Sequence, residues 1–373
     1  MGFIIYFFLN LNNYLLFLLL LIHIIFVYLL FYFYIYLLNS KIKMESIINN
    51  DELINYYNFN EDSSCISIST KYGFKIILCE PYDDHYECNL FSGIGIIEMY
   101  KSSNILILTG CEKNSKFPEN KLIIWDDNKK EIIKELRLIS KIRIIKIIKD
   151  VLFLVNDIKI YIFNFITLSL YHSFEIFSYK KEHISFNVNS NIKIAYLKNS
   201  ENIYIKHIKF NKSSKPKILS CKKDNDMSYI FLQFNTKGNI LAAACKECIY
   251  LYNTLNGDCV REISNENLQF ININCIKFNF SDKYLAVSIL QKNDGNIYIF
   301  DIDKENEKGF LDFIFKEDDQ YLAYYKLKCS DFIFSFDIND NIIIFTSYGE
   351  FFKVFFNKKN GEIKLIQNKK IFI

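Results

Sequence analysis

The chain has 373 residues, of which 51% are hydrophobic and 17% aromatic, and its 45 basic and 42 acidic residues give a net charge of +3. This near balance predicts no nucleic-acid partner, because nucleic-acid-binding domains usually carry a strongly basic face. The high share of hydrophobic residues suits one large domain with a buried β-sheet core.

An uncharged apolar run occupies residues 14–38. As a helix, these residues would extend about 37 Å, which is enough to cross a hydrocarbon core of about 30 Å. Lys41 and Lys43 follow the run, so the positive-inside rule would place the rest of the chain in the cytosol. Met44 offers another interpretation, in which the upstream residues are a gene-model artefact. A third interpretation is a segment that lies at the membrane–water interface. We therefore expect a hydrophobic leader over residues 1–43 and a separate domain over residues 44–373.

A short strand-like phrase recurs through the second domain. Between Leu78 in the first copy and Phe356 in the last, the mean step is about 46 residues, which is typical of propeller repeats. The seven copies are FKIILC (74–79), LIIWDD (122–127), IYIFNF (160–165), IYIKHI (203–208), IYLYNT (249–254), IYIFDI (297–302) and FKVFFN (352–357).

Turn signals separate apolar strand-like segments between these copies. They fall at residues 236–238, 255–258, 294–295 and 360–362, where Gly and Asn supply positive φ angles. The strand-like segments alternate only partly, as expected for blades that their neighbours bury on both faces. We predict an all-β, WD40-like, seven-bladed β-propeller, preceded by a hydrophobic N-terminal helix over the leader.

Motifs for catalysis, cofactors or metals are not apparent in the sequence. There is no P-loop, and the five His residues fall in no metal-binding pattern. Cys245 and Cys248 form a CxxC without a second pair, whereas a structural zinc site needs four ligands. Most of the 10 cysteines lie in apolar runs and are expected to be buried thiols. The sequence therefore predicts a protein that is not an enzyme, with no cofactor and no metal.

Longer phrases lie around the repeats at residues 58–82, 91–99, 117–130 and 320–373. In order and spacing, they resemble the PROPPIN (WIPI) family of phosphoinositide-binding propellers, over about residues 58–165 and 226–373. The resemblance implies a scaffold that binds phosphatidylinositol 3-phosphate or the 3,5-bisphosphate. Such a scaffold would act in autophagy or in membrane traffic.

The chain departs from this family at the lipid-binding motif. The family reads the headgroup with Phe/Leu-Arg-Arg-Gly between blades five and six, and guanidinium groups match phosphate oxygens. Here the motif position falls on Ile263, Ser264, Asn265 and Glu266, so both Arg are absent. Arg261, two residues earlier, and Ser288 in blade six are the lipid-binding candidates that remain. We expect weakened or lost headgroup binding.

A second family feature is the membrane-inserting loop of blade six. In this chain, the loop position holds five large apolar residues, namely Phe310, Leu311, Phe313, Ile314 and Phe315. They could wedge into a bilayer, because each large apolar side chain contributes about 1.5–3 kcal/mol when fully buried. Alternatively, they form an inner strand or pack on the blade.

The third family feature is an FNxD phrase, which helps one branch of the family to bind the bridge-like lipid-transfer protein of autophagy. Its Asn and Asp match Asn60 and Asp62. The alternative is a blade-opening turn, in which Asn and Asp hydrogen-bond to their own backbone.

Together, these patterns predict a non-enzymatic, PROPPIN-like scaffold in autophagy or phosphoinositide-linked traffic, with weakened or lost lipid binding. Its propeller is expected in the cytosol, peripheral to or anchored on an intracellular membrane. The alternative function is a generic WD-repeat adaptor between proteins, with no lipid or autophagy role.

Overall fold

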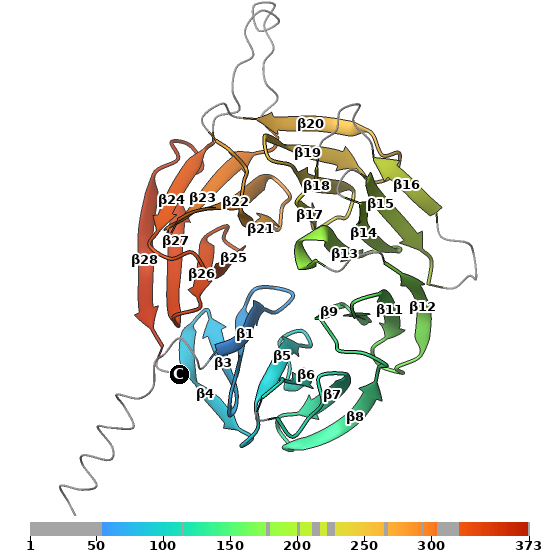
Figure 1. The fold of residues 1–373 in the computed structure, drawn as a ribbon. Coiled ribbons are helices and arrows are strands. Elements are labelled where there is room, and N and C mark those ends of the chain that lie inside the picture. Colours follow the sequence, from blue (N-terminus) through green and yellow to red (C-terminus); the bar gives the residue numbers. More distant parts are fainter. Residues whose placement is uncertain are drawn as a thin grey trace, which may run out of the picture. The chain divides into compact units, whose positions relative to one another are not determined.

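The computed structural model describes residues 54–113, 115–176, 180–199, 202–210, 217–221, 228–264, 268–292, 294–303 and 321–371. These residues form seven antiparallel four-stranded sheets, each built from four strands that are consecutive in sequence. The sheets are arranged around a common centre as the blades of a propeller (Figure 1). The predicted all-β, seven-bladed fold is confirmed. The helix expected over residues 1–43 lies outside the described residues.

The blades follow the chain in order, and their strands have the following bounds. Blades one and two contain β1 (Ile54–Phe59), β2 (Cys65–Thr70), β3 (Gly73–Cys79), β4 (Tyr82–Asn89), β5 (Ile94–Met99), β6 (Ile105–Gly110), β7 (Lys121–Asp126) and β8 (Glu131–Arg137). Blades three and four contain β9 (Ile144–Ile148), β10 (Val151–Val155), β11 (Lys159–Asn164), β12 (Leu170–Glu175), the short 3-10 helix η2 (Lys181–His183), β13 (Ile184–Val188), β14 (Ile192–Asn199), β15 (Asn202–Ile208) and β16 (Lys217–Cys221). Blades five to seven contain β17 (Phe231–Phe234), β18 (Ile240–Ala244), β19 (Cys248–Asn253), β20 (Cys259–Ser264), β21 (Ile273–Phe278), β22 (Tyr284–Gln291), β23 (Asp294–Asp301), β24 (Ala323–Leu327), β25 (Phe332–Phe336), β26 (Ile342–Thr346), β27 (Glu350–Phe356) and β28 (Ile363–Lys370).

Each copy of the repeated phrase falls mainly on the third strand of its blade, from β3 in blade one to β27 in blade seven. Burial falls from the middle of each blade toward the rim. In β10 all five residues of VLFLV are buried, whereas six of the seven residues in the outer strand β8 are exposed. The buried second strands read as continuous apolar runs because neighbouring blades cover both of their faces.

Each of the four turn signals contains one glycine, and three of these glycines have the predicted positive φ angle. Gly238, Gly257 and Gly361 have φ angles of 68°, 87° and 70°. Gly295 was expected in a turn but lies within β23, where an added Cβ would lie 2.1 Å from the ring of Phe332. Gly295 is therefore explained by close packing rather than by a turn.

The turns that join the first and second strands of the blades are called inner turns here. They are residues 60–64, 100–104, 149–150, 189–191, 235–239, 279–283 and 337–341. Several of them line a cavity of about 710 Å³. Polar contacts connect the inner turns of blades one to six to the next blade.

Hydroxyl, ammonium and carboxylate groups connect the inner turns of the first four blades. The Ser102 hydroxyl donates to Asp62 Oδ2 at 3.1 Å and joins blades one and two. The Tyr100 hydroxyl donates to Asp150 Oδ1 at 2.6 Å and joins blades two and three. Lys149 Nζ then donates to the Asn189 Oδ1 of blade four at 2.9 Å.

A carboxylate organises the contact between blades five and six. Asp282 Oδ1 accepts hydrogen bonds from the backbone N–H and the hydroxyl of Thr236, both at 2.7 Å. Asp282 Oδ2 accepts from Asn235 Nδ2 at 3.0 Å and from the Lys237 N–H at 3.1 Å. Since a carboxylate makes stronger hydrogen bonds than a neutral acceptor, this contact stabilises the junction of blades five and six.

Blade seven meets blade one through side chains. The hydroxyls of Ser63 and Ser335 lie 2.7 Å apart, and the Tyr57 hydroxyl donates to Asp331 Oδ1 at 2.8 Å. Lys353 pairs with Asp337 at 3.0 Å within blade seven. Its ammonium also contacts Glu80 of blade one. The described sheets share no strand across this junction, so side chains close the ring.

Within the part of the chain that the structure describes, no helix is long and apolar enough to cross a membrane.

We predict that Asp282→Asn lowers the free energy of unfolding by about 1.5–3 kcal/mol, the usual loss for hydrogen bonds to a charged group. In the variant, the amide N–H₂ would face Asn235 Nδ2 and the Lys237 N–H. In the unaltered chain, both of these donors have the Asp282 carboxylate as their acceptor. Equilibrium unfolding in urea measures this loss. Glu112→Gln makes the same change at an exposed position and should have little effect. Equal midpoints for the two variants would contradict the role of Asp282.

Candidate functional site

The position of the family's lipid-binding motif begins at the end of β20, the outermost strand of blade five. Ile263 is fully buried among apolar residues of blades five and six that include Phe270 and Phe300. Ser264 pairs with Cys248 of β19 and is half-buried. The structure therefore places a short hydroxyl side chain at the position where the resemblance leads us to expect the first Arg. Asn265 and Glu266 lie outside the described residues.

Arg261 lies on the same strand and reaches the neighbouring blade. Its Nη1 donates to the backbone carbonyls of Asp301 and Ile302 at 3.1 and 2.7 Å. These carbonyls belong to the end of β23 and the residue after it, so the guanidinium connects blades five and six. This contact gives the Arg261 guanidinium hydrogen-bond partners within the protein, so its position needs no lipid to explain it.

Ser288, the lipid-site candidate of blade six, is fully buried in β22. Its hydroxyl accepts from the Cys275 N–H at 2.9 Å and lies 3.3 Å from the Cys275 carbonyl oxygen. Both contacts are with β21 of the same blade, and they satisfy the hydroxyl. The hydroxyl is therefore occupied within blade six.

An aromatic group on blade six was missed by the sequence analysis. The ring of Tyr298 lies 5.1 Å from that of Tyr321 and 5.0 Å from that of Tyr324. The Tyr324 hydroxyl donates to Asn296 Oδ1 at 2.9 Å, and burial raises the pKa of Tyr298 to about 12. The YLAYY phrase (321–325) was a signal for this group, but the rings meet only because β23 pairs with β24.

The CxxC pair lies at the two ends of the β18–β19 turn. Cys245 Sγ and Cys248 Sγ are 3.3 Å apart and both residues are buried. The hydrogen bond from Cys248 lowers the pKa of the Cys245 thiol, although burial opposes this shift. Among the described residues, three potential metal ligands come together only at the exposed group of Asp83, Asp84 and His85.

The blade-one turn binds its own backbone and its neighbour. Asn60 is only 4% exposed, and its Oδ1 accepts from the Cys65 N–H at 3.0 Å. Asp62 is exposed, and its Oδ1 accepts from the N–H of Ser64 at 3.1 Å. Hydrogen bonds from Ser64 and Ser102 lower the pKa of the Asp62 carboxyl, although its partial burial opposes them. The two residues thus form the blade-opening turn, with only Asp62 at the surface.

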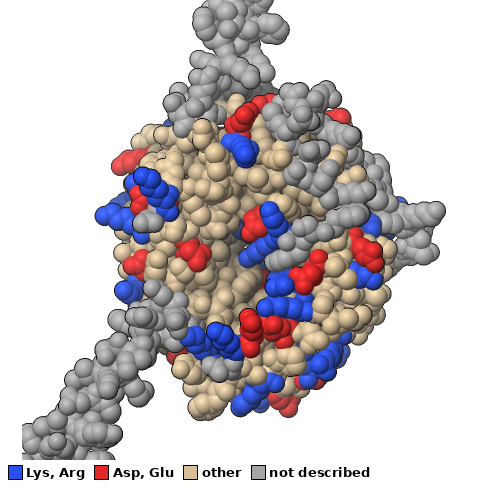
Figure 2. All heavy atoms as spheres, in the orientation of Figure 1, with Lys and Arg blue, Asp and Glu red and all other residues tan. Residues whose placement is uncertain are grey.

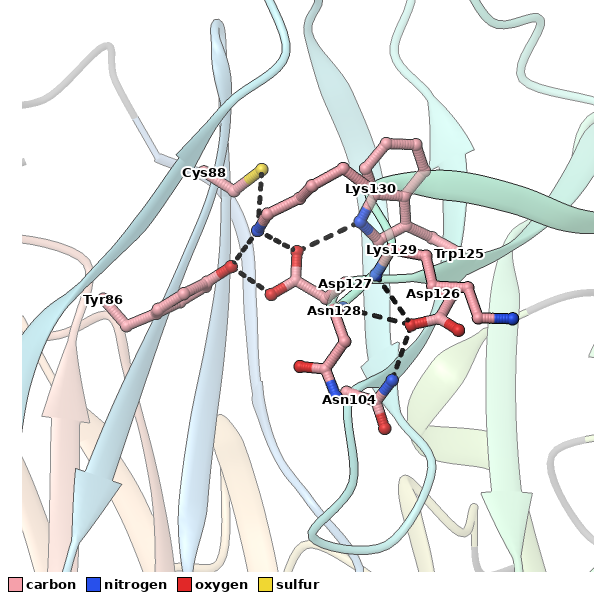
Figure 3. Close-up of polar contacts among 9 residues, drawn as sticks. All are labelled: Tyr86, Cys88, Asn104, Trp125, Asp126, Asp127, Asn128, Lys129 and Lys130. Carbon is pink, nitrogen blue, oxygen red and sulfur yellow. Dashed lines mark hydrogen bonds and ion pairs between the residues drawn. The ribbon is translucent and has the colours of Figure 1, made fainter.

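Trp125 and Asp126, in the second copy of the repeated phrase, belong to a polar cluster at the outer edge of blades one and two (Figure 3). Asp126 Oδ1 accepts from Asn104 Nδ2 at 2.6 Å and from the Asn128 N–H at 3.0 Å. Trp125 Nε1 donates to Asp127 Oδ1 at 3.1 Å. The first aspartate therefore caps the turn after β7, and the second orients the indole.

The same cluster reaches blade one. Lys130 Nζ donates to Asp127 Oδ1 at 2.8 Å, and both residues contact the Tyr86 hydroxyl of β4 (Figure 3). These bonds lower the pKa of the Asp127 carboxyl, although burial opposes them. The paired aspartates are thus occupied in structural contacts rather than arranged as an acid–base pair.

The five apolar residues of the predicted membrane-inserting loop, Phe310, Leu311, Phe313, Ile314 and Phe315, lie outside the described residues.

Comparison with known proteins identifies autophagy-related relatives. Autophagy-related protein 18 of Kluyveromyces marxianus is 31% identical over 153 residues, which are 41% of this chain and 28% of that protein. SVP1-like protein 2 of Debaryomyces hansenii is 38% identical over 106 residues, which are 25% of this chain and 24% of that protein. The matches thus cover less than a third of these relatives. No family model matches the chain.

Solved propellers share the fold over most of the chain. Kluyveromyces lactis Hsv2 has a TM-score of 0.67 at 19% identity, over 85% of this chain and 99% of that one. KlAtg21, in its complex with the coiled-coil of AgAtg16, has a TM-score of 0.70 at 16% identity, over 86% of this chain and 100% of that one. The resemblance to PROPPIN propellers is confirmed, and these relatives agree with the prediction of a non-enzymatic protein.

We predict that Arg261→Gln lowers the free energy of unfolding by about 1–3 kcal/mol, because two carbonyls of blade six lose a charged donor. Urea unfolding measures the loss. Arg137→Gln removes an exposed guanidinium at the end of β8 and should change the stability little. If Arg261→Gln has the same free energy of unfolding as the unaltered chain, the contact between the blades does not contribute to stability and the prediction is wrong.

Proposed function

We propose that this protein is a propeller scaffold in autophagy or in phosphoinositide-linked membrane traffic, with weakened or lost recognition of 3-phosphoinositide headgroups. It works on the cytosolic side of an intracellular membrane. The autophagy-related relatives and the Hsv2-like fold support the scaffold role.

The observation that carries the proposal is the position of Arg261. Two adjacent guanidinium groups are the donors that the family uses for phosphate. This chain has Ser264 and Asn265 in their place. The nearest Arg donates to Asp301 and Ile302 of blade six, so moving it to a headgroup would leave two carbonyls without this donor. This cost supports weak lipid binding.

Vesicle flotation tests the proposal with residues 44–373, which leave out the apolar run. We expect equal binding to vesicles with phosphatidylinositol 3-phosphate and to vesicles of the same charge made with phosphatidylserine. The triple variant Ser264→Arg, Asn265→Arg, Glu266→Gly restores the family's donors and should gain a preference for the 3-phosphate. Strong binding of the unaltered chain that depends on the 3-phosphate would contradict the proposal.

We also propose that the blade-one turn binds an autophagy lipid-transfer protein through Asp62, the exposed acid of the turn. Asn60 is buried and supports Asp62 by holding the turn. Asp62→Ala should reduce capture of that protein in a pull-down, whereas Glu112→Ala, at an exposed acid on blade two, should not. Unchanged capture by Asp62→Ala would favour the general adaptor function.

A further inference from the structure

Lysine side chains gather in the central channel, away from the position of the lipid motif. A cavity of about 220 Å³ is lined by Lys146 of β9, Lys181 of η2 and Lys277 of β21. Lys146 and Lys277 also line the cavity of about 710 Å³ beside the inner turns. Blades three, four and six thus each place an ammonium group in the channel. Figure 2 shows charged side chains around the central opening.

The described acids at the smaller cavity balance the charges of its three lysines only in part. Glu98 of β5 is 1% exposed and lies 3.5 Å from Lys146 Nζ. Glu182 also lines the smaller cavity. Lys181 lies over the Tyr56 ring at 5.2 Å. Lys277 makes no hydrogen bond or ion pair with any residue in the described ranges. At the smaller cavity, three cations therefore face Glu182 and Glu98, and Glu98 is already paired with Lys146. The larger cavity adds Lys101 together with Glu61 and Asp62.

Lys277 is in an unfavourable position for a lone cation. Desolvation lowers the pKa of its ammonium, and the charges of Lys146 and Lys181 lower it further, while Cys275 and Glu98 oppose the shift. Lys277 is half-buried, and a nearby countercharge favours the charged form of a partly desolvated ammonium group. An anion that enters the channel would supply that countercharge.

The neutral polar groups of the cavity are already engaged with the protein. Gln233 Nε2 donates to the Phe234 carbonyl at 3.0 Å, and the Ser185 hydroxyl accepts from the Phe234 N–H at 3.0 Å. The amides of Asn58 and Asn274 donate to Glu98 and to the Phe332 carbonyl. The ammonium groups are the charged donors of the cavity, and they favour a negatively charged ligand over a neutral one.

We propose that the central channel binds a small, soluble polyanion with several phosphate groups, held by Lys146, Lys181 and Lys277. Several phosphates suit three cations that come from different blades and surround one cavity. A free polyphosphate fits better than a membrane lipid, because Lys146 and Lys277 lie on inner strands of the blades, β9 and β21. The proposal does not depend on the function proposed above.

Calorimetric titration of the full chain tests the proposal, with inositol hexakisphosphate and inorganic phosphate as the two probes. Inositol hexakisphosphate is expected to bind saturably and more tightly than inorganic phosphate. Lys277→Met should weaken its binding about tenfold or more, as for the loss of one charge-assisted hydrogen bond. The same variant should not lower the Tm of the unliganded protein, since it removes an unpaired charge. Lys359→Met removes an exposed lysine and should bind like the unaltered chain.

Three results would overturn the proposal. They are no saturable binding, equal binding by Lys277→Met and Lys359→Met, and a channel-dependent preference for vesicles with phosphatidylinositol 3-phosphate over the soluble probes. The last result would assign the channel to a lipid headgroup. If Lys277→Met fails to fold, Lys181→Met gives the same test, because Lys181 is exposed at the channel and its loss leaves the core intact.

Discussion

Side-chain contacts between neighbouring blades are the constraint on which this propeller depends. Each described sheet uses four consecutive strands, so hydrogen bonds between strands hold each blade but do not join one blade to the next. The inner turns supply part of the missing connection through hydroxyl, amide and carboxylate groups. Asp282, with four donors from blade five, is the densest of these contacts. Buried apolar clusters that span adjacent blades supply the rest.

This constraint also explains why the lipid motif can change while the fold persists. The expected motif position begins at the end of the outer strand of blade five, and the buried Ile263 anchors that strand. Arg261 stabilises the same junction from two residues away. Ser264, at the expected position of the first Arg, is half-buried at the end of this strand. Ser264 can thus replace Arg at little cost to the core.

Much of this architecture was predictable because the strand phrases repeat. The seven copies identified the third strands, and turn signals at Gly238, Gly257 and Gly361 marked the hairpins. Contacts between blades were not predictable, since they join residues far apart in sequence. From the sequence alone, Asn60 and Asp62 could therefore form either a blade-opening turn or a partner-binding site. The channel lysines went unnoticed for the same reason, because they come from three different blades.

The central claim is that this propeller has kept the PROPPIN-like fold while losing the guanidinium pair that reads the lipid. The most direct test is the position of the tagged full chain in cells before and after inhibition of the kinases that make 3-phosphoinositides. The account predicts an unchanged distribution. Release of the protein from membranes on inhibition would contradict it.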